Sequence, residues 1–400
     1  MLRFLTAGES HGPALVAILD GLPAGLALDP DRINAQLRRR QRGHGRGRRM
    51  AIESDQAEVL SGVRHGRTTG GPLALVVRNK DWTHWQATMS PDAADRERTD
   101  RPPVTRPRPG HADLSGAIKY GHRDLRDVLE RASARETAAR VAAGSVARQL
   151  LARFAVEVAS HATAIGSVGL ENPAEVTFER VLAISDESAL RCVDPTVEQR
   201  MLEEIDRAKA AGDTVGGAFE VIAHQVPPGL GSYVQWDRKL DGRIAQAIMS
   251  IPAVKGVGIG LGTQAAATWG SGVHDAILPL PFDERRGVRP VGRASNRAGG
   301  LEGGVTNGED VRVTGYMKPI ATLMKPLPSL DLQTLDAAPA VIERSDVCAV
   351  PAAGVVAEAM ICLVLADAFI EKFSGDSIDE LARNYEAFTR DVSQRFGGRP

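Results

Sequence analysis

Two histidines in glycine-flanked loops are the first candidates for chemistry in this chain. His11 lies in "AGESHGPAL" and His111 lies in "RPGHAD". Glycine lets the backbone approach a ligand closely, and imidazole titrates near neutral pH, so both side chains suit acid–base catalysis. A single loop histidine is more often a plain surface residue. Two of them, together with the arginine-rich run described next, favour a catalytic site.

The arginine-rich run provides positive charge without acidic neighbours. Seven arginines lie between Arg38 and Arg49, with glycines at positions 43, 45 and 47. Guanidinium groups bind carboxylates or phosphates through two parallel hydrogen bonds. A solvated loop or an RNA-binding patch has a similar composition, but the run lacks aromatic residues for base stacking and the formal net charge of the chain is only -1. The run therefore favours a small polyanionic ligand.

Two further segments carry groups that could take part in such a site. The segment "ERASARETAARVAAG" predicts the start of a helix, with Ser133 and Thr137 near its N-terminus and arginines at positions 131, 135 and 140. Free backbone amides and the helix dipole bind anions at such an end, although a capped surface helix is the alternative. Later, "VIERSDVCAVP" places Arg344 and Asp346 on a loop before a helix, where a simple ion pair is the alternative.

Other chemistries find no support in the sequence. The histidines and cysteines form no HxH, HExxH or CxxC spacing, so we expect no metal site. The sequence also lacks a Walker A motif, a GxGxxG after a strand and a nucleophile elbow, which argues against nucleotide binding and serine hydrolysis. The residues alone therefore predict an enzyme that acts on a polyanionic small molecule by histidine acid–base chemistry.

The elements that position these residues begin with two strands. "LRFLTA" and "PALVAILDG" predict strands on either side of the His11 loop, and Asp29, Pro30 and Asp31 predict the start of a helix. "EVLSGVRHGRTTGGPLALVVRN" predicts a strand, a turn and a strand. The strongest helix pattern is "SARETAARVAAGSVARQLLARF", whose small residues allow close packing. Functional loops are expected at about 38–50, 82–112 and 280–300, of which 82–112 is polar and rich in proline.

The second half of the chain mixes strand and helix patterns without regular alternation. Such a mixture predicts an α+β fold with antiparallel sheets rather than a doubly wound parallel sheet. "LEGGVTNGEDVRVTGYMKPI" is also similar to the "LSGVRHGRTTGGPLALVVRN" stretch of the first half, which suggests an internal duplication. We expect a single domain over residues 1–400.

Composition indicates a soluble protein of ordinary type. Of the 400 residues, 43% are hydrophobic and 25% are charged. Three widely spaced cysteines, Cys192, Cys348 and Cys362, fit a reducing cytosol. We find no secretory signal pattern, and the most apolar stretch, "VVAEAMICLVLADAFI", contains two acidic residues and predicts a buried helix. We therefore expect a cytoplasmic protein that binds neither membranes nor nucleic acid.

Six stretches, in order from residue 8 to residue 360, resemble the chorismate synthase family. They are "GESHGPALVAILDGLPAG", "RPGHAD", "ERASARETAARVAAG", "GGLEGGVTNGEDV", "KPIAT" and "RSDVCAVPAAGVVAEAM". The resemblance implies an α+β sandwich of helices and antiparallel sheets. It also implies a lyase of the shikimate pathway that eliminates phosphate from 5-enolpyruvylshikimate 3-phosphate to give chorismate. That reaction uses reduced FMN without net redox change, and the family is usually a homotetramer.

The resemblance also implies a role for individual residues. His11 would protonate the departing phosphate, His111 would protonate or hold the reduced flavin near N1, and Asp346 would work with flavin N5 to remove the ring proton. Substrate contacts would come from Ser10, Arg46, Arg49 and Arg135, and NADPH is a candidate reductant at Arg40 and Arg46. FMN contacts would come from Arg131, Ala132, Ser133, Pro252, Ala253, Gly303, Lys318, Pro319, Ile320, Ala321, Thr322 and Arg344.

Two other functions use the same features. An RNA-binding protein could use "RRRQRGHGRGRR", and it would bind RNA with a steep salt dependence and no response to FMN. A flavin-dependent oxidoreductase could use the same anion sites, and it would consume reduced cofactor in each turnover.

Overall fold

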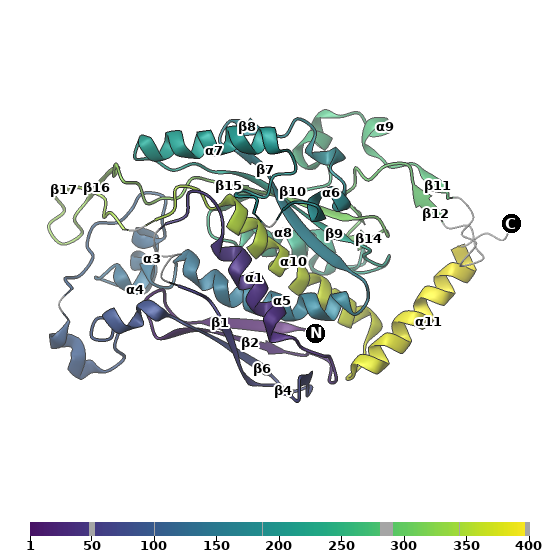
Figure 1. Cartoon of the computed structure of the whole chain (residues 1–400), viewed down its shortest axis with the longest axis horizontal. Coiled ribbons are helices and arrows are strands. Elements are labelled where there is room, and N and C mark those ends of the chain that lie inside the picture. Colours follow the sequence, from purple (N-terminus) through teal and green to yellow (C-terminus); the bar gives the residue numbers. More distant parts are fainter. Residues whose placement is uncertain (48–52, 100, 186, 281–290, 344, 397–400) are drawn as a thin grey trace.

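Two antiparallel sheets lie on either side of a layer of helices in the computed structural model, which describes residues 1–47, 53–99, 101–185, 187–280, 291–343 and 345–396 (Figure 1). The first sheet has the order β1-β2-β6-β3, with β1 at Arg3–Ala7, β2 at Ala14–Asp20, β3 at Ala57–Ser61 and β6 at Leu73–Arg78. The second has the order β10-β15-β9-β7-β8, with β7 at Glu157–Ile165, β8 at Val168–Gly169, β9 at Gly217–His224, β10 at Val254–Ile259 and β15 at Val311–Met317. The predicted α+β fold with antiparallel sheets is confirmed.

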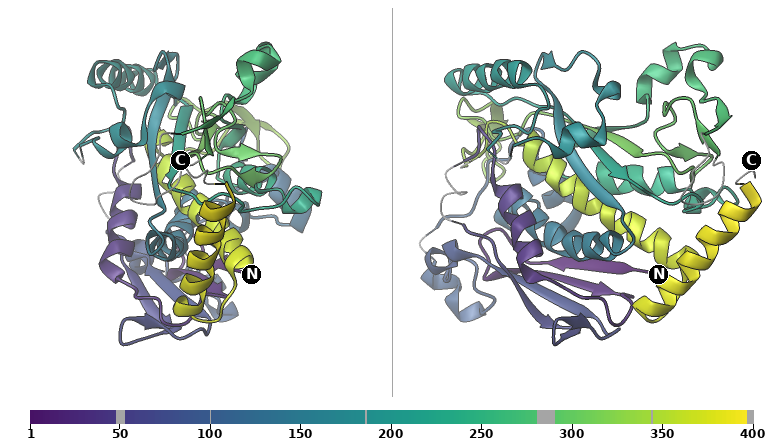
Figure 2. Two further views of the ribbon diagram at one scale, coloured as in Figure 1. Left: turned by 90° about the vertical axis from the view of Figure 1, so that its right-hand side faces the viewer. Right: turned by 45° about the vertical axis from the view of Figure 1, so that its right-hand side comes forward.

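Four helices fill the space between the sheets: α1 at Pro30–Gln41, α5 at Thr137–Ala152, α8 at Leu240–Met249 and α10 at Val350–Phe373. Helix α5 packs on β2 and β6, whereas α10 packs on β7 and β9. Figure 2 shows the same order of layers from a second direction. The outer helices are α3 at Asp113–Tyr120, α4 at Arg126–Leu129, α6 at Phe178–Leu182, α7 at Pro195–Ala210, α9 at Gly270–Val273 and α11 at Ile378–Phe396.

The N-terminal strands form because their side chains alternate between the core and the surface. Leu15, Ala17 and Leu19 on β2 are buried, whereas Ile18 is exposed and lies opposite Leu5 of β1. This period of two matches a sheet with one buried face. The two predicted strands around the His11 loop are confirmed, and their inner face packs on α5.

Helix α5 is central because its small residues let α10 approach closely. A Cβ atom added at Gly144 would lie 2.4 Å from the Cβ of Ala359, so only glycine fits at this crossing. The sequence pattern placed the helix start at Ser133. In the structure, Ser133 caps a short 3₁₀ turn, Ala134–Glu136, by accepting a hydrogen bond from the backbone N–H of Arg135, and α5 then begins at Thr137.

Helix α10 carries a buried charge cluster in an apolar setting. By length and composition it could cross a membrane, and it is the one such helix in the described chain, but it lies buried between α5 and the second sheet. Its Glu358 carboxylate accepts hydrogen bonds from Arg39, Arg148 and Ser160. Burial alone would raise the pKa of Glu358, but the two guanidinium groups outweigh burial and hold this pKa at about 2. The predicted buried helix is confirmed.

Replacing Glu358 with Ala is expected to lower the free energy of unfolding by about 3 kcal/mol, because two partly buried arginines lose their shared counterion. Urea denaturation measures this loss. The control is Glu371→Ala, which removes a half-exposed carboxylate that pairs with Arg238 and Arg243 and is expected to cost less than about 1 kcal/mol. Equal losses in the two variants would contradict a special role for the buried cluster.

The depressed pKa of Glu358 also sets the pH range of this contribution. The folded pKa of about 2 lies below an unfolded value of about 4.3. The stabilisation is therefore present above the unfolded pKa and is lost as the pH falls toward the folded pKa. The stability difference between the wild type and Glu358→Ala should shrink across that acid range.

The two similar sequence stretches occupy corresponding places in the two sheets. Short ribbons, β4 (Val63–Arg64) with β5 (Arg67–Thr68) and β13 (Leu301–Glu302) with β14 (Val305–Thr306), each precede a long strand. Those long strands, β6 and β15, lie in the interior of their sheets. The arrangement agrees with the internal similarity, and duplication itself stays a prediction.

The last helix, α11, was not expected from the sequence analysis. Its apolar face packs on the end of α10, where the ring centroids of Phe373 and Tyr385 lie 5.2 Å apart and those of Phe373 and Phe388 lie 5.4 Å apart. Beyond these contacts the helix extends away from the sandwich (Figure 1). Pairs of short strands lie outside the main sheets: β11 (Ile277–Pro279) with β12 (Val291–Arg293), and β16 (Pro328–Leu330) with β17 (Ala337–Pro339).

Candidate active site

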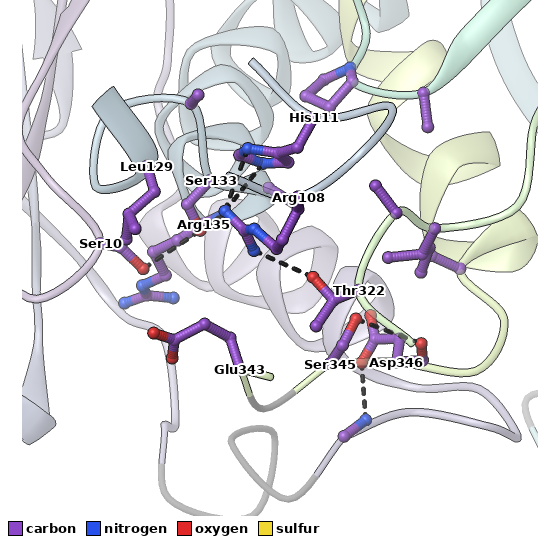
Figure 3. Close-up of a pocket in the computed structure, with 18 of the residues that line it drawn as sticks. Ser10, Arg108, His111, Leu129, Ser133, Arg135, Thr322, Glu343, Ser345 and Asp346 are labelled. Atoms are coloured by element: carbon purple, nitrogen blue, oxygen red, sulfur yellow. Dashed lines mark hydrogen bonds between the residues drawn. The ribbon is translucent and has the colours of Figure 1, made fainter. Parts of the chain in front are cut away.

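A cavity of about 400 Å³ lies where loops from both ends of the chain meet. Its walls come from the β1–β2 loop, the end of α1 with the loop after it, and the 85–112 segment. The other walls are the segment 129–135 before α5, the segment between α8 and β10, the end of β15 with the segment after it, and the loop before α10. Figure 3 shows 18 of its residues and labels ten of them. The volume lies within the range of about 300 to 1,000 Å³ that small-molecule sites usually have.

The β1–β2 loop lies at the cavity because residues far along the chain, Glu130 and Ser133, form hydrogen bonds with it. Gly8 has a φ of +101°, and a Cβ atom there would lie 2.3 Å from the backbone oxygen of Ala14. The backbone N–H of Ser10 donates to the carbonyl of Glu130, and the Ser10 hydroxyl donates to Ser133 at 3.1 Å. The loop is therefore fixed against the segment that precedes α5, which explains how reactive side chains near the N-terminus come to be interior.

His11 lies in this loop between a carboxylate and an aromatic ring. Its Nδ1 is 2.8 Å from Oε1 of Glu130, and its ring stacks on Trp85 with centroids 4.0 Å apart. Trp85 and Glu130 are both buried. Trp85 therefore contacts one face of the His11 ring, and Glu130 binds its Nδ1 edge.

His111 has a carboxylate partner of the same kind. Its Nδ1 lies 2.5 Å from Oδ1 of Asp113, whose carboxylate also accepts from Arg108. Burial would raise the pKa of Asp113, but hydrogen bonds from His111 and Arg108 hold this pKa well below its usual range. The carboxylate that orients His111 is therefore charged at any pH near neutrality.

Arg108 connects His111 to the opposite wall of the cavity. Its guanidinium donates to the hydroxyl of Thr322 at 2.9 Å and lies beside the His111 ring (Figure 3). The sequence analysis did not single out Arg108. Its position three residues before a glycine-flanked histidine was the available signal.

The expectation that the arginine run has no acidic partner is wrong. Arg40 is buried and donates to Asp55 at 2.8 Å, and Arg46 pairs with Asp346 at 2.6 Å. Burial alone would raise the pKa of Asp55, but Arg40 and Arg135 outweigh it and lower this pKa. Asp55 and Asp346 both lie outside the arginine-rich run in sequence, and the fold places them beside its arginines. Residues 38–41 of the expected loop also belong to α1.

Asp346 takes part in two contacts with the loop after α1. Its Oδ1 accepts the backbone N–H of Gly47 at 2.6 Å, and its Oδ2 pairs with Arg46. A simple ion pair between Asp346 and its sequence neighbour was the alternative considered above. Arg344 lies outside the described residues, and the pair that the structure describes joins two loops that lie 300 positions apart in sequence.

The described residues of the segment 82–112 contact several other parts of the chain. Short 3₁₀ helices form at Lys80–His84 and Ala93–Arg98. Trp85 packs on His11, and Val104 packs against Leu125 in a small apolar cluster. Lys318 donates to the carbonyl of Gly110 at 2.7 Å, and burial together with nearby Lys255 lowers the pKa of this lysine. These contacts attach the segment to the cavity wall.

Positive charge dominates the cavity. Among the described lining residues the carboxylates are Glu343 and Asp346, whereas the cations are Arg40, Arg46, Arg108, Arg135 and Lys318. The formal net charge of the whole chain is -1, so this excess is local. Such a cavity attracts a ligand with several negative charges.

The sequence matches known proteins over nearly its whole length. A family model described as chorismate synthase matches residues 2–370. The chain belongs to the chorismate synthase family. A chorismate synthase of Solibacter usitatus is 55% identical over 392 residues, covering 98% of this chain and 99% of the relative. One of Desulforudis audaxviator is 55% identical over 403 residues and covers both chains fully.

A solved structure described as a crystal structure of chorismate synthase has a similar fold. It superposes with a TM-score of 0.77 at 43% sequence identity and covers 98% of each chain. The sandwich described above is thus a chorismate synthase fold, and the family resemblance drawn from six sequence stretches is confirmed.

Most site residues implied by the chorismate synthase resemblance line the one cavity. The structure brings together Ser10, His11, Arg40, Arg46, His111, Ala132, Ser133, Arg135, Pro252, Ala253, Lys318, Ile320, Ala321, Thr322 and Asp346. The role of each of these residues stays a prediction.

Some expected contacts lie elsewhere. Arg131 donates to the backbone oxygens of Thr6 and Gly8 and so holds β1. Gly303 lies in the turn between β13 and β14, and neither it nor Pro319 is among the described lining residues. Arg49 and Arg344 lie outside the described residues, as does much of the expected 280–300 loop. The described part of that loop does not line the cavity.

Proposed function

We propose that this cavity eliminates phosphate from 5-enolpyruvylshikimate 3-phosphate to give chorismate, with reduced FMN bound beside the substrate. The observation that carries the proposal is the meeting of five cationic side chains and two carboxylate-held histidines around one cavity. The substrate has two carboxylates and a phosphate, and FMN brings another phosphate. One site must therefore neutralise several negative charges, as this cavity can.

The cavity wall fits a flavin as well as an anion. Small residues, Ala132, Pro252, Ala253 and Ala321, leave room for a flat ring system, and Lys318 and the hydroxyls of Ser133 and Thr322 offer donors. Bound reduced FMN supplies electron density that helps the carbon–oxygen bond break. The protein positions the reactants, excludes water and moves protons.

Three side chains carry the proton chemistry in this proposal. His11 would donate a proton to the departing phosphate, and His111, whose ring Asp113 orients, would help to hold the flavin. Asp346 would help to remove the ring proton of the substrate when the flavin is bound. Asp346 pairs with Arg46, so Arg46 transfers its hydrogen bonds to a substrate anion when Asp346 acts as a base.

Replacing Arg46 with Ala is expected to raise the substrate KM by about 10- to 100-fold, because a hydrogen bond to a charged group contributes about 1.5 to 3 kcal/mol. Steady-state kinetics measure the change, and thermal melting serves as a check on folding. The control is Arg78→Ala, which removes an exposed arginine paired with Glu58 on the first sheet. A collapsed melting temperature with an unchanged KM would make Arg46 structural.

We propose that the chain takes flavin that is already reduced. Arg40, a candidate NADPH contact, is buried and donates to Asp55 and Thr137. Two of its three guanidinium nitrogens therefore already have partners within the protein. Reduction of FMN by NADPH with the purified protein alone would contradict this part of the proposal.

An anaerobic assay with 5-enolpyruvylshikimate 3-phosphate and chemically reduced FMN tests the function. We expect one phosphate per chorismate and no net oxidation of FMN. Net consumption of reduced FMN in each turnover would favour an oxidoreductase. Failure to form chorismate, together with salt-dependent RNA binding, would favour the RNA-binding alternative.

We also propose that the protein is a cytoplasmic homotetramer, as the family resemblance implies. The outer face of the first sheet exposes Leu5 and Ile18 opposite each other, at 74% and 41% of their full exposure. An exposed apolar pair on the outer face of a sheet suits contact with a second copy. Light scattering of the purified protein tests this proposal, and a monomer would contradict it.

A further inference from the structure

Glu130 holds the backbone and the side chain of the His11 segment together. Its Oε2 accepts the backbone N–H of His11 at 2.8 Å, and its Oε1 lies 2.8 Å from Nδ1 of the His11 ring. The carbonyl of the same residue accepts the backbone N–H of Ser10 at 2.9 Å. Glu130 is buried beside α4 and does not line the cavity among the described residues, so its partners are groups of the protein itself.

The chemistry of these contacts fixes where the ring carries its proton. A carboxylate can only accept hydrogen bonds, so a proton must reside on Nδ1 for the short contact to be favourable. The neutral ring then has its lone pair on Nε2, and the charged ring has an N–H there. The backbone N–H already occupies the other carboxylate oxygen, which prevents Glu130 from reorienting.

The ring cannot easily escape this arrangement by flipping. Trp85 stacks on the His11 ring with an interplanar angle of 22°, and the guanidinium of Arg101 lies 3.9 Å from the centroid of the Trp85 ring. Two other charged groups lie near the His11–Glu130 pair. Asp81 Oδ2 is 3.9 Å from Nε2 of His11, and Arg126 is 3.9 Å from Oε1 of Glu130. Asp81 is beyond hydrogen-bond distance and attracts the charged form of the ring without fixing its tautomer.

We propose that Glu130 is a positioning residue that fixes the Nδ1–H tautomer of His11, so that His11 delivers its proton only as an imidazolium, through Nε2. This inference rests on the proposed role of His11 as the acid. In the step, the Nε2–H bond breaks and an O–H bond forms on the phosphate. The electron pair of the carbon–oxygen bond leaves with the phosphate, and His11 remains as a neutral ring with its proton on Nδ1.

The decisive variant is Glu130→Gln, which preserves size and reverses hydrogen-bond direction. The amide oxygen accepts from the backbone N–H of His11, and the amide nitrogen then donates to Nδ1. Nδ1 lies 2.8 Å from the position that the amide nitrogen takes and 3.1 Å from that of the amide oxygen, so the shorter contact favours the neutral ring with its proton on Nε2. We expect kcat to fall by about 100- to 10,000-fold, as when a buried carboxylate that orients a catalytic histidine becomes an amide, with KM changed by less than about threefold.

A spectroscopic measurement separates this inference from the proposed function. Nitrogen-15 NMR of histidine-labelled protein distinguishes the two neutral tautomers, and the His11 signal is identified by its loss in His11→Asn. We expect the Nδ1–H form in the wild type and the Nε2–H form in Glu130→Gln. This result is independent of turnover, so failure of the chorismate assay would overturn the proposed function and leave the tautomer measurement standing.

Two further variants complete the test. Glu130→Asp keeps a carboxylate, although its side chain is shorter, and should retain more activity than Glu130→Gln. If Glu130 only supported the fold, the Gln variant, which preserves side-chain size, would be the more active of the two. Asp81→Asn removes the other nearby carboxylate and should leave the Nδ1–H tautomer in place. An Nε2–H tautomer in the wild type, a kcat of Glu130→Gln within threefold of the wild type, or a tautomer change in Asp81→Asn would overturn the inference.

Discussion

Asp346→Asn is expected to fold, to bind oxidised FMN and to lose about 100- to 10,000-fold in kcat, because a positioned acid–base group contributes that much. The amide oxygen can still accept the backbone N–H of Gly47, so the loop keeps one of its two contacts. The carboxylate that would remove the ring proton is lost. Anaerobic kinetics and the quenching of flavin fluorescence measure the two effects separately.

The matched control for Asp346 is Glu343→Gln. Glu343 is the second carboxylate among the described lining residues, and its loss changes the charge of the cavity by the same amount. We expect a much smaller effect on kcat, because Glu343 has no assigned proton transfer. Similar losses in both variants would indicate that cavity charge alone matters, and a wild-type rate in Asp346→Asn would refute the assignment.

His111→Ala should also lower kcat by about 100- to 10,000-fold while the protein remains folded. The buried Asp113 carboxylate keeps its hydrogen bonds from Arg108 after the imidazole is removed, so no buried charge is left without a partner. Anaerobic turnover measures the loss, and circular dichroism checks the fold.

His122→Ala is the control for His111→Ala. His122 lies eleven positions further along the chain, is partly exposed and pairs with Asp127 at 3.4 Å. It does not line the described cavity, so its removal should leave turnover close to that of the wild type. Full activity in His111→Ala would remove this residue from the mechanism.

Local patterns in the sequence determined the elements of this protein and its candidate groups. The apolar run "PALVAILDG" predicted β2, and Asp29 followed by Pro30 predicted the start of α1, because strand propensity and helix capping are properties of adjacent residues. The six family-like stretches likewise indicated the family, since each is a short contiguous run. His11, His111 and Asp346 could be singled out for the same reason.

The partners of these groups were decided only by the tertiary structure. Glu130 meets His11 across 119 positions, Asp346 meets Arg46 across 300 positions, and neither pairing leaves a local pattern. Such contacts depend on how α5 and α10 pack between the two sheets, where one glycine, Gly144, sets the distance between the helices. The arginine run therefore looked unpaired in sequence although the fold supplies its acids. Side-chain type determines what chemistry is available, and packing determines which groups can share a proton.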